Sequence, residues 1–573
     1  MDRNLLLVFL LLAVVIFASQ FLMRRYAPQQ PPSNAHPKEP IQPATPSTSP
    51  SARASAGEAA ALPTKAAAPT EARKQAQSES EIVVENALYR VTFTNRGALV
   101  KSWVLKKFSD DQGRPLDLVH SSAAAKYGYP LSLWSYDESL RGKLNSVLYL
   151  PSSSSQVLTS PASLSFEYSD SSLTVRKNFR FDPSYVVGVE TSVFVDGRPA
   201  YAFPAWPAGF GDQSNLQAYA SSQFEYQWNN TTEHLLAKKV SGGNTLHGSY
   251  DWAGVSSSFF AAVFIPDEPG DVTVVTLHNV IDVAPDPSKP NETKPGDVLG
   301  AAVGRPGESR GRLFVGPKSL EVLEAVPVPT VIGAEKDLRG LVNFGSLGLI
   351  ARPLFLWLRW TNQYLHNWGW SIVIQTLIIT IALLPLRITQ MKSALKMQRV
   401  QPQMKAIQEK YKKYGMRDPR KQDMQKEIAE LYKREGVNPV GGCLPLLVQL
   451  PFLWAYYKML GAAIDLRQAH WLWIHDLSSR DPYFILPLVM VVSMFLMQKM
   501  TPQTGMDPAQ QRMMNFMMPA MMGFIFFNLA AGLNLYYAES NVIMILQQAI
   551  MNRTELGREM RELAAKRARK KEK

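Results

Sequence analysis

The sequence predicts a polytopic α-helical membrane protein that carries a large all-β domain. Three observations lead to this fold class. Residues 5–23 form a charge-free apolar run, five further apolar runs follow after residue 368, and the stretch between them is rich in alternating β-type segments. Apolar runs of about 20 residues are long enough to cross a bilayer, and period-two alternation is typical of half-buried strands.

The first apolar run predicts an N-terminal transmembrane anchor over residues 1–25. A cleaved signal peptide is the alternative, but the run is long for one and Arg24 and Arg25 follow it in place of a small-residue cleavage site. Residues 26–80 are rich in Pro, Ala, Ser and Gln. They predict a disordered linker because they hold too few large apolar residues to fold.

Residues 81–334 predict an all-β sandwich domain. Segments such as IVVENALYRVTFTN and YVVGVETSVFVDG are separated by clusters of Gly, Pro, Asp and Ser, which is the pattern of short strands and turns. The acidic residues are scattered and the histidines are isolated. No catalytic set is predicted, and no metal site either, because the single cysteine, Cys443, excludes a thiolate cluster.

Residues 335–386 predict an amphipathic helix on the membrane surface followed by a second transmembrane helix. Pro353 is expected to turn the chain from one into the other. The apolar face of the surface helix holds Leu338, Leu341, Val342 and Phe344, with Arg339 among the lipid headgroups. Residues 441–552 hold the other four runs, which predict transmembrane helices three to six.

Two basic segments predict the orientation in the membrane. Residues 387–440 read as a helical hairpin, and 387–438 holds 14 basic and 6 acidic residues, a net charge of +8. The tail, 553–573, holds 9 basic and 4 acidic residues, a net charge of +5. Because basic loops stay on the cytoplasmic side, both segments are expected inside and the β domain outside.

Four motifs resemble a known family. NPVGGCLPLLVQLPF, DLRQAHWLWIHDLSSRDPYFILP, DPAQQRMMNFM and GLNLYY occur in this order. Together they resemble the YidC/Oxa1/Alb3 membrane protein insertases, and in particular the branch from Gram-negative bacteria. The resemblance is specific over 335–573 and looser over 80–334. It implies a five-helix core with a hydrophilic groove beside the anchor, and a periplasmic domain of β-supersandwich fold.

The resemblance also implies a function and its partners. A member of this family inserts and folds proteins of the bacterial inner membrane, alone or with the Sec translocon, and uses no cofactor. The expected partners are nascent inner-membrane proteins, the ribosome, the Sec translocon and the lipid bilayer, with no small-molecule substrate. Phosphate contacts with the ribosome or contacts with anionic lipid are expected from Lys405, Lys412, Lys413, Arg417, Arg420, Lys421, Arg567, Arg569, Lys570 and Lys571.

The expected groove departs from the family at two positions, and Thr380 is the first. Gram-negative members carry an arginine where this chain has Thr380. At 100° per residue, Thr376, Thr380 and Arg387 fall on one helix face, so Arg387 is a candidate for a weaker positive charge at the groove mouth. The alternative for Arg387 is a plain interfacial anchor, and for the threonines a hydrogen bond back to their own helix.

Other polar side chains in the apolar runs complete the predicted groove. Glu539 is unusual because the family has an apolar residue there; it is expected either to line the groove or to be neutral between helices. Gln449 is expected in the groove or in an interhelical hydrogen bond. The full set is Gln375, Thr376, Thr380, Arg387, Gln449, Leu450, Leu453, Tyr536, Tyr537 and Glu539.

Methionines cluster in the later runs, where 11 of the 22 fall between residues 490 and 522. Flexible thioethers suit a surface that accepts many apolar helices, and lipid-facing filler is the alternative. The predicted hydrophobic slide consists of Met490, Met494, Met497, Met514 and Met518. Two other functions stay open, a secondary transporter and a membrane-anchored sugar-binding protein, although no internal repeat supports the first.

Overall fold

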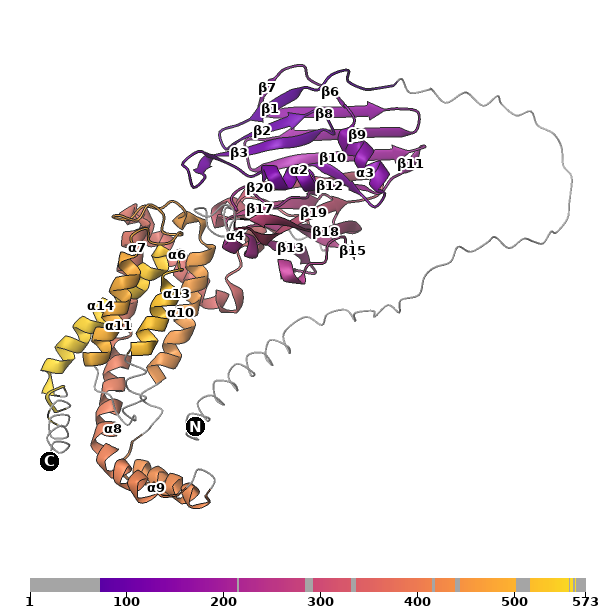
Figure 1. Ribbon diagram of the computed structural model, residues 1–573. Helices are drawn as coiled ribbons and strands as arrows, with labels where there is room; N and C mark the ends of the chain where they lie inside the picture. The colour runs from indigo at the N-terminus through magenta and orange to yellow at the C-terminus, as the bar shows by residue number, and fades with distance from the viewer. Residues whose placement is uncertain are drawn as a thin grey trace, which may run out of the picture. The chain divides into compact units, whose positions relative to one another are not determined.

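The computed structural model of the chain (Figure 1) has a β-rich region followed by a helical region. The predicted anchor over residues 1–25 and nearly all of the predicted linker lie outside the described residues. The structure describes residues 73–213, 216–283, 292–330, 336–414, 418–437, 444–500, 516–555, 557–559 and 562.

The β-rich region contains three sheets. The first has the order β4-β3-β2-β1-β7, the second β14-β13-β16-β17-β20-β10-β9-β8-β6 with β11 beside β10, and the third β15-β18-β19-β12-β5. The strands of the first are β1 (Glu81–Glu85), β2 (Tyr89–Thr94), β3 (Leu99–Ser109), β4 (Pro115–Asp117) and β7 (Val157–Thr159). Only β1 and β7 pair in parallel among the described strands.

The two other sheets are assembled from strands that lie far apart in the sequence. Those of the second are β6 (Leu150–Pro151), β8 (Ala162–Ser169), β9 (Leu173–Phe181), β10 (Val186–Val195), β11 (Arg198–Pro199), β13 (Gln223–Trp228), β14 (Thr231–Leu236), β16 (Tyr250–Ser256), β17 (Phe260–Pro266) and β20 (Glu308–Pro317). Those of the third are β5 (Ser132–Ser135), β12 (Ala202–Trp206), β15 (Thr245–Gly248), β18 (Val272–Val283) and β19 (Lys294–Gly304). Short helices in this region are α2 (Ser121–Tyr127), α3 (Glu138–Ser146), α4 (Leu216–Ala220), η1 (Ala237–Lys239) and α5 (Leu320–Glu324).

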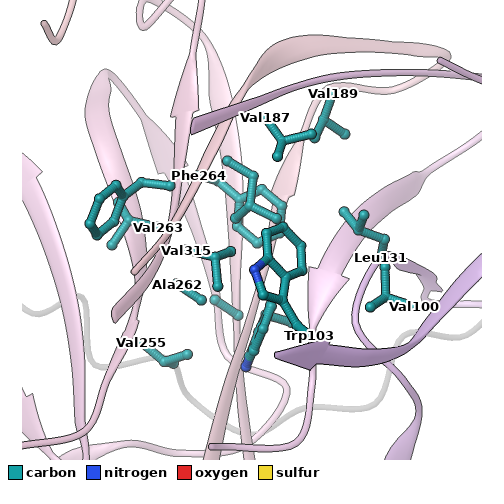
Figure 2. Close-up of a cluster of buried hydrophobic side chains, with 14 of the residues drawn as sticks. Val100, Trp103, Leu131, Val187, Val189, Val255, Ala262, Val263, Phe264 and Val315 are labelled. Atoms are coloured by element: carbon teal, nitrogen blue, oxygen red, sulfur yellow. The ribbon is translucent and has the colours of Figure 1, made fainter. Parts of the chain in front are cut away.

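One hydrophobic core joins these sheets. Figure 2 shows Trp103 of β3 beside Val187 of β10 and Phe264 of β17. The ring centroids of Trp103 and Trp206, from the first and third sheets, are 6.0 Å apart. Because burying a large apolar side chain is worth about 1.5–3 kcal/mol, this shared core holds the β-rich region together. The prediction of a large β domain is confirmed.

A buried lysine lies inside this core. In β9, alternate residues are buried, and Lys177 falls on the buried side. Its ammonium group donates hydrogen bonds to the carbonyl oxygens of Gly97, Ala98 and Leu131 at 2.7, 3.2 and 2.9 Å. All three N–H donors of the side chain therefore have acceptors, which makes the burial of a polar group tolerable.

The helical region follows. Its elements are η2 (Leu338–Leu341), η3 (Gly345–Leu347), α6 (Gly348–Leu365), α7 (Trp368–Ala382), α8 (Leu384–Lys410), α9 (Arg420–Arg434), α10 (Leu444–Ala462), η4 (Ile464–Leu466), α11 (Ile485–Met500), α13 (Met518–Phe526) and α14 (Ala531–Arg553). Within the part of the chain that the structure describes, no single helix is both long and apolar enough to cross a membrane. The pair α7 and α8, bent by 46°, meets the length and composition requirements when taken together.

The predicted surface helix is wrong for its first part. Leu338 and Leu341 are fully buried and belong to the core of the β-rich region. Arg339 pairs with Asp337 and Glu324 at 2.7 and 2.8 Å. An apolar stripe predicts that its side chains are buried, but it does not predict whether lipid or protein covers them. Here the β-rich region covers them.

The predicted turn at Pro353 is also wrong, because α6 continues through this residue. Leu354, Phe355 and Leu358 pack into the core of the helical region. Their burial outweighs the single backbone hydrogen bond that a proline removes.

A helical hairpin is formed by α8 and α9. Val400 and Met404 of α8 pack against Ile428 and Leu431 of α9. The outer faces carry the charges, for example Lys410, which pairs with Glu427 at 3.2 Å. The hairpin thus has a thin apolar seam and a solvated, basic exterior.

Candidate functional site

The site begins with a buried glutamine on α7. The Gln375 side chain accepts a hydrogen bond from the Tyr456 hydroxyl of α10 at 2.9 Å and donates one to the Leu354 carbonyl of α6 at 2.9 Å. Gln375 is fully buried. One side chain thereby connects three helices, and the hydrogen bonds compensate for the burial of its amide.

A tyrosine pair continues this buried layer from α10 to α14. The rings of Tyr456 and Tyr536 stack with centroids 4.1 Å apart and planes 20° apart. Tyr537 meets Phe526 of α13 edge to face at 4.6 Å. Aromatic pairs of this kind fix the distance between helices. The adjacent residues Tyr536 and Tyr537 of α14 therefore hold this helix against α10 and α13.

The two threonines of α7 hydrogen-bond to their own helix. The hydroxyl of Thr376 donates to the Ile372 carbonyl and that of Thr380 to the Thr376 carbonyl, each at 2.7 Å. This geometry matches one of the two alternatives that the sequence leaves open. It uses the only hydrogen of each hydroxyl, while the oxygen lone pairs stay able to accept.

A half-exposed polar surface lies beside this layer. We call it the polar strip; it consists of Thr380, Arg387, Glu539, Met544 and Gln547. The α7 and α14 helices pack against each other, with α11 beside α14 (Figure 1). Gln547 donates to the Thr380 carbonyl at 3.4 Å, so the strip crosses from one helix to the other.

The two ionisable groups of the strip have different surroundings. Arg387 donates from Nη2 to the Met544 sulfur at 2.6 Å, which turns its guanidinium toward α14. Glu539 lies next to Thr376. Oxygen Oε2 of Glu539 is buried and has no hydrogen-bond partner among the described residues.

The loop between α10 and α11 covers the N-terminal end of α14. The carboxylate of Asp476 accepts hydrogen bonds from Gln468 N and Ser478 N at 2.9 and 2.8 Å, and from the hydroxyls of Ser478 and Ser479. The carbonyls of Leu477 and Ser479 in turn accept from the first two amides of α14, at 2.8 and 2.6 Å. These carbonyls thereby satisfy two of the unpaired amides at the start of α14.

The remaining predicted groove residues are partly described. Leu453 is half-buried against the helical core. The side chains of Gln449 and Leu450 lie outside the described part of the structure. The structure thus brings together Gln375, Thr376, Thr380, Arg387, Tyr536, Tyr537 and Glu539 along α7, α8 and α14.

The predicted methionine slide is only partly described. Met490 is buried, and Met494 and Met497 on the same helix are half-buried. Met514 and the side chain of Met518 lie outside the described residues. Whether these methionines meet clients stays a prediction.

The basic residues predicted to contact ribosome or lipid lie on the hairpin where the structure describes them. Lys405, Lys412, Lys413 and Arg420 are exposed and Lys421 is half-buried. The other five lie outside the described residues: Arg417, Arg567, Arg569, Lys570 and Lys571.

Sequence reasoning missed one polar residue of the site, Gln547, and the hydrogen-bond partners of another, Asn534. Gln547 follows Tyr536 and Ser540 by eleven and seven residues, which places all three on one face of α14; this spacing was the available signal. Asn534 is fully buried and donates to the Phe526 and Leu529 carbonyls at 3.1 and 3.2 Å. No sequence signal indicates that Asn534 would cap the preceding helix.

Two family models together cover both regions. Residues 81–357 match the model described as the YidC periplasmic domain, and residues 360–558 match the model described as the 60Kd inner membrane protein. With the β-rich region and the helical region that carries the polar strip, these matches define an inner membrane protein with a periplasmic β domain.

Curated relatives identify the family. The membrane protein insertase YidC of Syntrophus aciditrophicus is 30% identical over 96% of this chain and 100% of its own length. That of Wolinella succinogenes is 44% identical over 42% of each chain. A solved structure titled an active YidC insertase with its first transmembrane domain resolved has a TM-score of 0.36 and 20% identity, over 84% of this chain and 94% of its own. The chain belongs to the YidC membrane protein insertase family.

Proposed function

We propose that this chain inserts proteins into the inner membrane by passing their polar tails along the polar strip. The observation that carries the proposal is the strip itself. Thr380, Arg387, Glu539 and Gln547 are half-exposed on α7, α8 and α14. A polar tail crossing the membrane needs partners along its path, and these side chains are placed to supply them.

The energetics support a passive mechanism. A charged side chain at the centre of a bilayer costs about 2.5–3.5 kcal/mol on insertion scales. Polar groups along the strip lower this cost for the tail. The apolar segment of the client then enters lipid with a gain of about 25 cal/mol per Å² of apolar surface buried, so no nucleotide or other energy source is needed.

The proposed topology has an N-terminal anchor, five core helices, a hydrophilic groove and a cytoplasmic hairpin and tail. Two features support it: the basic charge of 387–438 and 553–573, and the polar strip that α7, α8 and α14 share. The strip with Gln375, Thr376, Gln449, Leu450, Leu453, Tyr536 and Tyr537 is proposed to line the groove. The methionines of α11 are proposed to receive the apolar segment.

The proposed partners follow from the charge distribution and from the family. The exposed lysines of the hairpin suit the phosphates of ribosomal RNA, and the basic tail suits the same surface. Cooperation with the Sec translocon is proposed from the family alone.

The test is insertion of a small single-span client into liposomes that carry the purified protein. We expect protease-protected client well above the level in protein-free liposomes, with no nucleotide added. The absence of insertion for every client would overturn the proposal. Uptake of a labelled solute would then favour the transporter, and binding of an aldose would favour the sugar-binding protein.

A further inference from the structure

Glu539 stands out among the apolar helices. It is the only acidic residue in α7, α10, α11, α13 and α14. It follows the first residue of α14, Ala531, by eight positions, which places it about 12 Å into the helix. An ionisable residue at this depth is rare unless it has a function.

The groups around Glu539 leave one oxygen of its carboxyl group without a hydrogen-bond partner among the described residues. The Thr376 hydroxyl lies within hydrogen-bonding reach of the Glu539 carboxyl group, and it also donates to the Ile372 carbonyl at 2.7 Å. The Tyr456 hydroxyl hydrogen is likewise directed at Gln375 Oε1. Oxygen Oε2 is buried without a hydrogen-bond partner among the described residues. The hydroxyls of Thr376 and Tyr456 thus both donate to acceptors other than Oε2.

The positive charge of the strip does not neutralise Glu539. Arg387 points at Met544, which follows Glu539 on α14 by five residues, or about 7.5 Å along the helix. Among the described residues, no basic side chain lies within 4.0 Å of the Glu539 carboxylate. Burying a carboxylate without a partner is unfavourable, so a cation from outside the chain would find an unoccupied acceptor here.

We propose that Glu539 receives a lysine or arginine of the client, so that the protein inserts basic tails in preference to acidic ones. The proposal rests on the proposed insertase function and names its client class. The Glu539 side chain as a whole is half-exposed beside the strip, while its Oε2 is buried, so the client's cation would approach through the exposed part of the side chain. A lysine has the length to reach it, because its apolar stem can lie along the strip while its ammonium meets the carboxylate.

The test compares three clients that differ only in the tail. Each has the same apolar segment and a tail with two lysines, two serines or two aspartates. Liposomes of neutral lipid remove the attraction of basic tails to the bilayer surface. We expect the basic tail to be inserted about threefold or more over the acidic tail, the size of a typical polar pair in a membrane.

Three variants give the comparison its controls. Glu539→Gln removes the charge and is expected to abolish the preference for the basic tail over the acidic one. Glu555→Gln removes an exposed carboxylate near the end of the same helix and is expected to keep the order. Glu539→Asp keeps the carboxylate and is expected to keep the preference for the basic tail. This variant tests the role of the carboxylate if Glu539→Gln does not fold.

The outcomes are distinct. Equal insertion of all tails by the unchanged protein overturns the inference, and so does an order that survives in Glu539→Gln or is lost in a folded, active Glu539→Asp. Failure of the unchanged protein to insert any client contradicts the insertase function instead.

Discussion

The Tyr456 hydroxyl donates a hydrogen bond of 2.9 Å to Gln375 Oε1, which links α10 to α7 inside the helical region. Gln375 passes the connection on to α6 through the Leu354 carbonyl, and Tyr456 passes it to α14 through its stack on Tyr536. Four helices therefore depend on two side chains. The polar strip lies directly beside this layer, so its geometry depends on the same pair.

Removal of this pair is expected to loosen the helical region. Gln375→Leu and Tyr456→Phe each break the bond, while the phenylalanine keeps the stack on Tyr536. We expect a coupling energy between them of about 0.6–1.7 kcal/mol, the range for hydrogen bonds between membrane helices. Unfolding of the two single variants and the double variant in detergent measures it. Fully additive effects would show that the bond contributes nothing.

The charge of Arg387 is expected to act on the client's tail. Arg387→Ala should lower insertion of acidic tails and leave serine tails unchanged, because only a charged tail responds to the guanidinium. Arg387→Lys is the matched control and should retain most of the effect. The measurement is liposome insertion with the three tails. An equal loss for all tails would instead identify Arg387 as an interfacial anchor.

A second arginine is expected to shift the preference further. Thr380→Arg adds a positive charge to the strip where Gram-negative members of the family are expected to have one. The acidic tail should gain relative to the serine tail, and the basic tail should lose, in the same assay. Unchanged ratios would place Thr380 away from the path of the tail.

Lys177 is expected to make the stability of the β domain depend on pH. Burial lowers the pKa of Lys177 to about 7, from 10.5 for a free side chain. Between these values the unfolded chain binds more protons than the folded one, so the unfolding free energy should rise as pH increases from about 7 toward 10.5. Thermal unfolding of the full-length protein in detergent, followed by the tryptophan signal, checks this.

The control variants separate charge from packing. Lys177→Met should remove the rise with pH, and it should cost about 1–3 kcal/mol at high pH because buried carbonyls that accept from the lysine lose their donor. Lys107→Met changes an exposed lysine of β3 and should leave both properties unchanged. A rise with pH that persists in Lys177→Met would assign it to another group.

The loop between α10 and α11 is expected to stabilise the start of α14. Asp476→Ala removes four hydrogen bonds that shape the loop. The amides of Ala531 and Gly532, which donate to loop carbonyls, should then exchange about tenfold faster, equivalent to about 1.4 kcal/mol. Ser479→Ala removes one of the four bonds and should have a smaller effect. Hydrogen exchange measures both, and unchanged rates would show that the loop holds its shape without Asp476.

The alternation of segments such as β9 was enough to predict strands, but not how they pair. The second sheet joins β20 to β10 across more than a hundred residues, and periodicity carries no information on such pairing. Helical spacing predicted Thr376, Thr380 and Arg387 on one face of a continuous helix, but α7 ends at Ala382 and Arg387 lies on α8, which is bent by 46° from it; the spacing still placed the two threonines on one helix. The spacing could not show whether a threonine hydroxyl is free or donates to its own helix, because the positions of the residues are the same in both cases.

The apolar stripe around Leu338 shows the other limit of sequence reasoning. The pattern correctly predicted that these side chains are buried, but it wrongly predicted that lipid buries them. Lipid and a protein core both favour apolar side chains, so the pattern does not distinguish the two. Glu539 was conspicuous by its type alone. Only the structure shows that the hydroxyl hydrogens around it point at other acceptors.

Cysteine cross-linking tests the polar strip as the client's path most directly. In a Cys443→Ser background, single cysteines are placed at Thr380 and Gln547 on the strip. Controls are placed one residue away, at Ile381 and Leu546, which are more exposed at 54% and 58%. A client with one cysteine in its tail is then inserted into liposomes. We expect disulfides to Thr380→Cys and Gln547→Cys and few to the controls. Equal or stronger cross-linking to Ile381→Cys and Leu546→Cys would show that the tail does not follow the strip.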